Sequence, residues 1–405
     1  MQVSTNSLRS AWFSAAIFTA LIVFAFWLGG GETPDPTKPI SLLIGAALGV
    51  AFERGRFCFF CLFREAFEEK KTRPLLSVVT AIAVGAIGYA LMFGLYLPNT
   101  DGEGLPPAAH ISPVSLPLVL GAFSFGLGMT LSGACISGHL YRIGQGYLRA
   151  IPALIGSLIG FGLGFFSWNT LYLEQVSESP VLWLPRWLGY SGSLLIILVL
   201  AAFLSFYLIR WDRSTETPSN YDSVPVAFQS RATANDLRDL LLVRRWSPVA
   251  TGSIVGAIGV VAYLRTTPLG VTSQLSTISR SVLDSRGALP EVLHGIDMMR
   301  GCVAVVSSTV TNNGWLVIGM VVASLAVAVG GGRFKLQIPT VGNSITALLG
   351  GVLLGWGSLT ALGCTVGALL SGTQAFAVSG FVFLAVVMLA VWIGVRFKLH
   401  RLFGA

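Results

Sequence analysis

Two short stretches, SGACISG (Ser132–Gly138) and LGCTVG (Leu362–Gly367), each place one cysteine among small and polar residues in an otherwise oily chain. A thiol can donate a weak hydrogen bond, and when ionised it is a nucleophile or a metal ligand. A helix that begins at such a stretch presents unpaired backbone N–H groups and a positive dipole end, which favour a bound anion. Cys135 and Cys364 are therefore the first candidates for contact with a small anion.

Small and polar residues beside these cysteines could support such a site. They are Gly133, Ser137, Gly138 and His139 around the first cysteine, and Gly363, Thr365 and Gly367 around the second. Close helix packing by small residues would explain the glycines equally well. His139 is open to two interpretations, substrate contact or an ordinary hydrogen-bonded helix residue, because an intramembrane ionisable group is a functional candidate by default.

A third stretch, FERGRFCFFC, places Arg54 and Arg56 just before Cys58. These arginines either anchor the chain at the membrane surface or form an electropositive funnel for an anion. The Cys58-x-x-Cys61 spacing occurs in zinc and redox sites, but zinc needs four ligands and no histidine lies at a supporting spacing. We therefore predict no metal and no cofactor. We interpret Cys61 and Cys302 as packing residues, and the sequence leaves open whether they contribute to function.

The composition places these stretches in a membrane. Of the 405 residues 54% are hydrophobic and only 11% are charged, whereas soluble domains carry about 25% charged residues. Six apolar runs are long enough, or nearly so, to cross a hydrocarbon core of about 30 Å: Ala11–Gly29, Leu75–Leu97, Ala150–Ser167, Ser193–Ile209, Gly314–Gly331 and Ala375–Val395. We interpret the first run as a retained helix, because it is longer than a signal-peptide core and no A-x-A-like site follows. The net charge of +8 reflects Lys/Arg-rich loops and gives little support to nucleic-acid binding.

The loop charges predict the orientation of the chain. Lys and Arg gather at Arg64–Arg73, at Arg142 and Arg149, around Arg210 and Arg245, at Arg333 and Lys335, and at Arg396–Arg401. Acidic residues occupy the alternate loops, namely Glu32 and Asp35, Asp101 and Glu103, and Glu174 and Glu178. Because positive loops stay in the cytoplasm, we expect about ten membrane segments in a bacterial inner membrane, with both termini cytoplasmic.

An internal repeat accompanies this topology. A polar linker (211–247) separates an N-terminal membrane half (1–210) from a C-terminal membrane half (248–405). When Cys135 is aligned with Cys364 without gaps, several pairs of identical residues coincide: Gly121 with Gly350, Gly126 with Gly355, Gly128 with Gly357, Gly138 with Gly367, and Gln145 with Gln374. The loop charges give the two segments opposite directions. The sequence therefore predicts an all-α polytopic membrane protein with two inverted pseudo-repeats and broken or re-entrant helices, an architecture typical of transporters.

Four motifs in order resemble the YeeE/YedE sulfur-transport family, and in particular its thiosulfate-uptake branch. They are GAALGVAFERGRFCF, FGLGMTLSGACISGHLYRIGQG, PLGVTS and LLGGVLLGWGSLTALGCTVG, and they span nearly the whole chain. The resemblance implies a pseudo-symmetric fold with re-entrant loops narrowing an hourglass, and Cys58, Cys135 and Cys364 along the substrate path. It also implies a small cytoplasmic sulfur-carrier partner of the YeeD/TusA type.

Three functions remain open on the sequence. The first is uptake of thiosulfate or a related small sulfur anion, for which neutral thiols would offer weak, repeated contacts, whereas a fixed midplane cation could trap the ion. Some relatives in the family are linked to selenium species instead. The second is a membrane thiol redox enzyme or sulfurtransferase that carries a persulfide, although no cysteine has a convincing base beside it. The third is a non-catalytic assembly subunit.

Overall fold

The computed structural model describes residues 5–30, 35–100, 102, 104–212, 242–296, 306–307 and 309–402. Cys302, the acidic-loop residues Glu32, Asp101 and Glu103, and positions 213–241 of the predicted linker lie outside the described residues.

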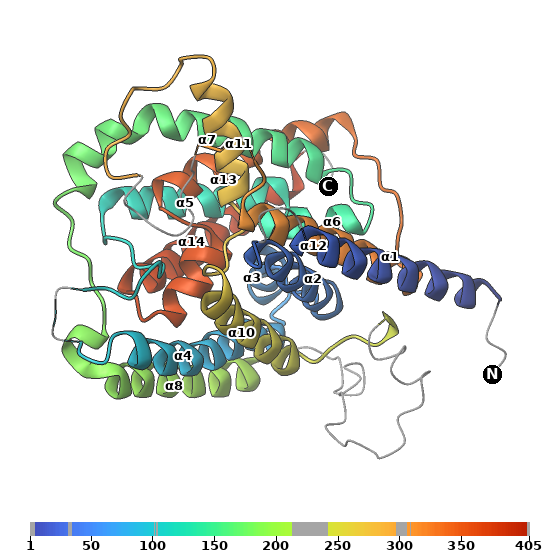
Figure 1. Cartoon of the computed structure of the whole chain (residues 1–405), viewed down its shortest axis with the longest axis horizontal. Coiled ribbons are helices and arrows are strands. Elements are labelled where there is room, and N and C mark those ends of the chain that lie inside the picture. The colour runs from blue at the N-terminus through green and yellow to red at the C-terminus, as the bar shows by residue number, and fades with distance from the viewer. Residues whose placement is uncertain are drawn as a thin grey trace.

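The described residues are mainly helical (Figure 1). The α-helices are α1 (Thr5–Gly29), α2 (Thr37–Gly55), α3 (Phe59–Glu68), α4 (Leu76–Tyr96), α5 (Leu116–Ser132), α6 (Ile136–Gly144), α7 (Ala150–Leu171), α8 (Pro185–Trp211), α10 (Pro248–Arg265), α11 (Ser273–Asp284), α12 (Asn312–Gly330), α13 (Val341–Thr360) and α14 (Val378–Arg396). Short helical turns are η1 (Arg73–Leu75), η2 (Tyr172–Val176), η5 (Thr365–Gly372) and η6 (Leu399–Arg401). Of these, η2 and η5 are π-helical.

The long helices have the length and apolar character of membrane spans. Within the described residues eight helices qualify, or nine when α13 and η5, bent by 42° at a short break, are taken as one broken span. The α2 helix is a further 19-residue segment, which carries Glu53 and Arg54 near its end. Large apolar side chains such as Phe26, Leu95 and Phe203 are exposed on the outer helices, as lipid contact requires. The predicted polytopic membrane class is confirmed.

The packing of α5 against α13 confirms the predicted inverted repeat. A Cβ atom on Gly121 would lie 2.8 Å from the Gly357 carbonyl oxygen, and a Cβ atom on Gly350 would lie 2.8 Å from the Gly128 carbonyl oxygen. The two helices therefore cross backbone to backbone and run antiparallel. Because the repeat exchanges Gly121 with Gly350 and Gly128 with Gly357, each of these contacts is the symmetry copy of the other.

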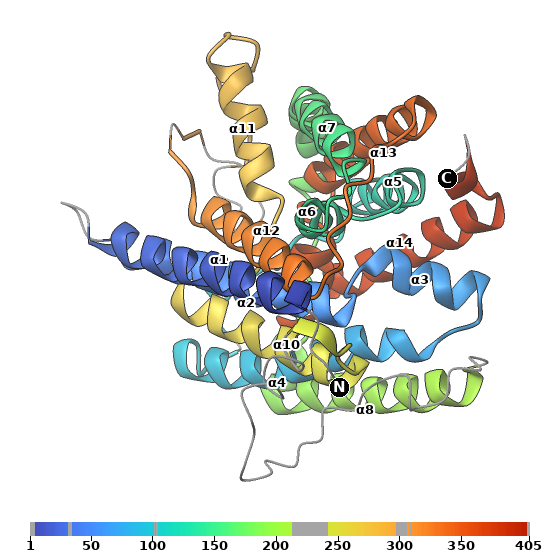
Figure 2. The ribbon, with the colours of Figure 1, turned by 90° about the vertical axis from the view of Figure 1, so that its right-hand side faces the viewer.

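The remaining helix contacts follow the same two-fold exchange. The α5 helix packs on α14 as α13 packs on α7, and α2 packs on α12 as α10 packs on α4. The short helices obey it too, since α3 packs on α14 and α11 packs on α7, and the peripheral helices pair as α1 with α12 and α8 with α4. Figures 1 and 2 both show α4, α8 and α10 together at the bottom of the view, with α2 next to α10. The exchange α2↔α10, α3↔α11, α5↔α13 and α6↔η5 thus relates every broken segment to a partner.

Candidate functional site

All three predicted path cysteines occupy the same local position, which is the residue just before the first turn of a short helix. Cys58 precedes α3, Cys135 precedes α6 and Cys364 precedes η5, each with extended backbone angles. All three are buried, with at most 1% of the residue exposed. Each thiol therefore lies beside the backbone N–H groups that the first turn of a helix leaves without helical partners.

The three breaks between helices share one backbone conformation. Two residues before each cysteine the chain enters the left-handed region, at Arg56 (φ 48°), Gly133 (φ 87°) and Leu362 (φ 54°). Glycine adopts this conformation readily, whereas arginine and leucine adopt it at a cost of roughly 1–2 kcal/mol. Two of the three breaks are therefore strained, as is common where a fold fixes a functional group.

Two of the thiols converge on one glycine. A Cβ atom on Gly138, in the first turn of α6, would lie 3.3 Å from the Cys58 sulfur and 3.5 Å from the Cys135 sulfur. Both sulfur atoms thus border the same point, and a side chain there would displace one or both. A residue without a side chain is therefore needed at position 138 both for close packing and to keep the space between the two thiols open.

Polar contacts tie Cys135 and Cys364 to their own helix starts. The Cys135 sulfur lies 3.2 Å from the Ser137 hydroxyl oxygen, and the Thr365 side chain is within hydrogen-bonding reach of the same thiol. The Cys364 sulfur accepts the backbone N–H of Gly367 at 3.5 Å. The predicted supporting residues Ser137, Thr365 and Gly367 therefore do lie at the cysteines, and Thr365 links the α6 side to the η5 side.

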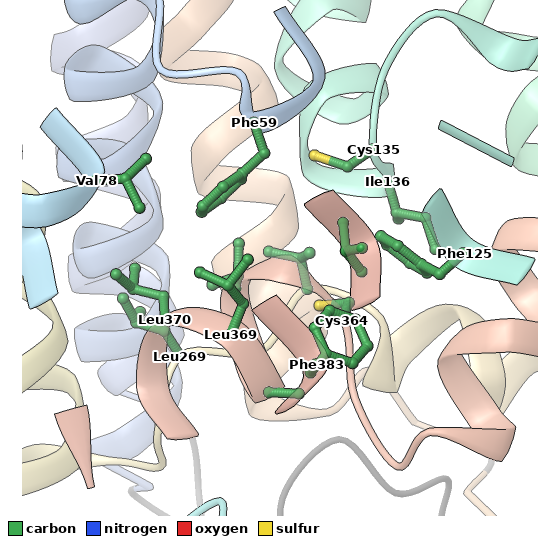
Figure 3. Packing of buried hydrophobic residues seen from close by; sticks show 14 of the residues in the cluster. Phe59, Val78, Phe125, Cys135, Ile136, Leu269, Cys364, Leu369, Leu370 and Phe383 are labelled. Carbon is green, nitrogen blue, oxygen red and sulfur yellow. The ribbon is translucent and has the colours of Figure 1, made fainter. Parts of the chain in front are cut away.

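Apolar side chains fill the space around these two thiols. Figure 3 shows Cys135 at the start of α6 and Cys364 at the start of η5, with Phe125, Ile136 and Phe383 packed nearby. Gly363 belongs to this tight packing, because a Cβ atom there would lie 2.6 Å from the Ala368 Cβ. Gly133 instead ends α5, and its carbonyl accepts a 3.2 Å hydrogen bond from Arg142.

A cavity of 430 Å³ reaches Cys58 from one end of the bundle. Its walls hold six arginines, namely Arg54, Arg56, Arg64, Arg142, Arg245 and Arg333, against the two carboxylates of Glu53 and Glu65. Cys58 and Cys61 line the same cavity. We refer to this space as the arginine cavity and to its end of the bundle as the arginine-rich face. Its positive excess favours an anion.

The two arginines singled out in the sequence differ in the structure. Arg54 is buried, and its guanidinium contacts Glu53 at 3.6 Å and donates to the carbonyls of Leu242 and Arg244. The same carboxylate, Glu53, also accepts two hydrogen bonds from Arg333 at 2.9 and 3.1 Å. Arg56 is exposed on the cavity wall. Arg54 therefore has a structural network, while Arg56 is available to a passing ion.

Cys61 and Arg142 form a contact that the sequence did not indicate. Arg142 donates a hydrogen bond of 2.8 Å to the Cys61 sulfur, and its ring contact with Tyr147 is 5.8 Å. The thiol is half-buried and faces the arginine cavity, so Cys61 has a polar contact besides its packing. Cys61 and Arg142 lie on different helices and far apart in the sequence, and no local motif joins them.

His139 is buried and does not line the arginine cavity. It lines a separate cavity of 300 Å³ together with Arg149. Its Nε2 atom has no hydrogen-bond partner among the described residues. Both interpretations of His139 therefore remain predictions. Within the described part of the chain, no three His, Cys, Asp or Glu side chains gather as a metal site would require.

The sulphur transport family model matches residues 54–393, which include all three cysteine breaks. The chain belongs to this family, as the sequence motifs implied.

Individual relatives agree with this assignment. The chain is 26% identical over 372 residues to the thiosulfate transporter TsuA of Escherichia coli (strain K12), covering 87% of this chain and 92% of that protein. It is 25% identical over 366 residues to the thiosulfate transporter TsuA of Spirochaeta thermophila, covering 87% of this chain and 96% of that protein. The probable transporter YedE of E. coli is 25% identical over 196 residues, which is 48% of this chain and 46% of that protein.

Proposed function

We propose that this protein takes up thiosulfate, or a closely related small sulfur anion, along a path formed by Cys364, Cys135 and Cys58. Two relatives of nearly matching length are named thiosulfate transporters. The observation that carries the proposal is the convergence of the Cys58 and Cys135 sulfurs on Gly138, since Cys58 also lines the arginine cavity.

The chemistry of the thiols suits a passing dianion. Neutral thiols donate weak hydrogen bonds, and the helix starts behind them offer N–H groups that offset negative charge. A buried arginine in the same place would bind the ion tightly, whereas conduction needs weak, repeated contacts. We therefore expect the three thiols to stay protonated while an ion is relayed between them.

The same proposal includes the orientation of the protein in the membrane. The arginine-rich face would lie on the cytoplasmic side of a bacterial inner membrane, together with both termini and the 211–247 linker. A small sulfur-carrier protein of the YeeD/TusA type would receive the anion there. The arginine cavity supports this choice, because anions released toward it meet a positive surface.

One contact favours a second candidate function. The Arg142 guanidinium beside the Cys61 sulfur is the kind of cation that stabilises a thiolate. A membrane sulfurtransferase would use such a thiolate to hold a persulfide. A covalently bound sulfur label on any of these cysteines after turnover, found by mass spectrometry, would favour this enzyme over the non-covalent path.

Growth and uptake assays test the proposal together. The protein is expressed in a strain that lacks sulfate and thiosulfate uptake, and thiosulfate, sulfate or selenite is supplied singly. We expect growth on thiosulfate and uptake of labelled thiosulfate into the same cells. Growth on sulfate without growth on thiosulfate would overturn the substrate assignment. Uptake of selenite without uptake of thiosulfate would favour the selenium branch.

A further inference from the structure

The two-fold exchange leaves one broken segment without a cysteine. It relates Cys135 before α6 to Cys364 before η5, and it relates α3 to α11. The residue that precedes α3 is Cys58, and the residue that precedes α11 is Thr272. Thr272 therefore precedes α11 as Cys58 precedes α3, at the opposite end of the bundle, but its backbone angles are helical where those of Cys58 are extended.

Thr272 has the property expected of a ligand contact. It is fully buried, and its hydroxyl oxygen has no hydrogen-bond partner among the described residues. Nearby hydroxyls of α11 differ: Ser276 donates to the Ser273 carbonyl at 3.1 Å, and Ser279 donates to the Leu158 carbonyl of α7 at 2.9 Å. Leaving a buried hydroxyl unpaired is costly, so this hydroxyl is poised for a partner that the protein itself does not supply.

The loop that carries Thr272 is attached to the helix that begins at Cys364. The Ser371 hydroxyl of η5 donates to the Leu269 carbonyl at 3.2 Å, and Figure 3 shows Leu269 beside Leu369 and Leu370 of η5. This arrangement is the counterpart of Cys58 beside α6. The loop that carries Thr272 is thus held against η5, as the loop that carries Cys58 is held against α6.

We propose that the Thr272 hydroxyl is the outermost contact on the substrate path and donates a hydrogen bond to the oxygen end of the anion. The inference rests on the proposed function and adds the group that recognises the ion before it reaches Cys364. A hydroxyl is a stronger donor to oxygen than a thiol is. An anion with sulfonate oxygens at one end and a soft sulfur at the other would meet the hydroxyl first and the thiols afterwards.

Kinetics of Thr272→Val, Thr272→Ser and Thr272→Cys test the inference in intact cells, with uptake of labelled thiosulfate measured over a range of concentrations. Valine keeps the shape and removes the donor, so the KM should rise about tenfold, equivalent to about 1.4 kcal/mol. Serine should keep the KM within about twofold of wild type, and cysteine should fall between them. Membrane protein levels and detergent gel filtration verify folding for each variant.

Thr251→Val is the matched control. Thr251 is also fully buried and its hydroxyl is also unpartnered among the described residues, but it lies within α10 against Gly55 rather than at a break. Its KM should stay at the wild-type value. Equal KM values for Thr272→Val and wild type, or equal losses for valine and serine, overturn the inference. If valine fails to fold, equal KM values for serine and cysteine overturn it. Absence of thiosulfate uptake by the wild-type protein overturns the proposed function and the inference with it.

Discussion

The segments that begin at Cys58 and at Thr272 occupy equivalent places in the fold and carry different chemistry. The α3 helix buries Phe59, Phe60, Leu62 and Phe63 behind a thiol. The α11 helix buries Ser273, Ser276, Thr277, Ser279 and Arg280 behind a hydroxyl. The packing of the two helices is therefore duplicated, while the side chains and the backbone at the break are not, since Cys58 is extended and Thr272 has helical angles.

The cavities at the two ends of the bundle also differ, in the charge of the residues that line them. The arginine cavity at the Cys58 end has 430 Å³ and six arginines in its wall. At the opposite end a cavity of 420 Å³ reaches Leu362, two residues before Cys364, and its lining in the described part of the chain carries no charged side chain. On the proposed path, an anion would meet a neutral cavity at one end and a positive cavity at the other. Charge asymmetry on a symmetric path favours accumulation of the ion at the arginine-rich face.

The strongest test of the thiol side is Cys135→Ala. Alanine fits the space but cannot donate, so uptake should fall roughly a hundredfold, the upper range for loss of a hydrogen bond to a charged group. Initial uptake of labelled thiosulfate in cells with equal membrane levels measures the change. Wild-type uptake by this variant would contradict a role for the Cys135 thiol in transport. The Thr272 hydroxyl would then be the main candidate for binding the ion.

Gly138→Ala sharpens the comparison by crowding the thiol side alone. Its Cβ would lie 3.0 Å from the Ala134 Cβ, 3.3 Å from the Cys58 sulfur and 3.5 Å from the Cys135 sulfur, so Ala134 and Cys58 are crowded most, and overpacking of this kind costs about 1–3 kcal/mol. Uptake should drop about tenfold. Gly94→Ala in α4 is the control, because a Cβ atom there meets nothing within 4 Å. Equal uptake in both variants would show that the point between the two sulfurs is not on the path.

Local spacing and loop charge predicted the repeat and the breaks at Cys135 and Cys364, but not the break at Cys58. Gly133 indicates a break in the helix, because glycine adopts the left-handed region readily. Arg56 and Leu362 adopt the same conformation without any such signal. The break at Leu362 was predicted through Cys364, whereas the break at Arg56 is visible only in the structure.

Other parts of the site depend on contacts between distant segments and could not be read locally. Arg142 meets Cys61 across helices, and Glu53 binds Arg333. Thr272 shows its relation to Cys58 only when helix partners are known, because the loop before α11 is longer than the loop before α3 and shifts the alignment. Charge patterns predict the side of the membrane, but tertiary packing decides which arginine is buried in a network and which is exposed.

Serine substitutions rank the thiols along the path. Serine remains a donor, so Cys364→Ser should keep more uptake than Cys135→Ser, with an expected difference of about fivefold. The physical reason is crowding, since Cys135 shares its space with Cys58 across Gly138 and with Ser137 and Thr365. That ratio of initial uptake rates is the measurement. The reverse order would indicate that the ion is held most tightly at Cys364, on the Thr272 side of the path.

Arg56→Gln tests the charge asymmetry. Removing one exposed positive charge from a cavity with five other arginines should lower uptake about threefold at low ionic strength. The effect should shrink at high salt, because exposed charges are screened beyond about 10 Å at 0.1 M. Inside-out vesicles measure both rates, because the proposed orientation exposes the arginine-rich face to the added solution. A loss that does not depend on salt would assign Arg56 to loop geometry, where its left-handed conformation already places strain.

Cys61→Ala should have the smallest effect and decides how far the thiol side extends. Arg142 would lose the sulfur contact but keep its hydrogen bond to the Gly133 carbonyl and its ring contact with Tyr147. The break at Cys135 should therefore hold, and uptake should stay within about twofold of wild type. A large loss accompanied by covalent label on Cys61 in the wild-type protein would favour the sulfurtransferase. A large loss without label would instead extend the non-covalent path by one thiol into the arginine cavity, and the two ends of the molecule would then differ by two thiols against one hydroxyl.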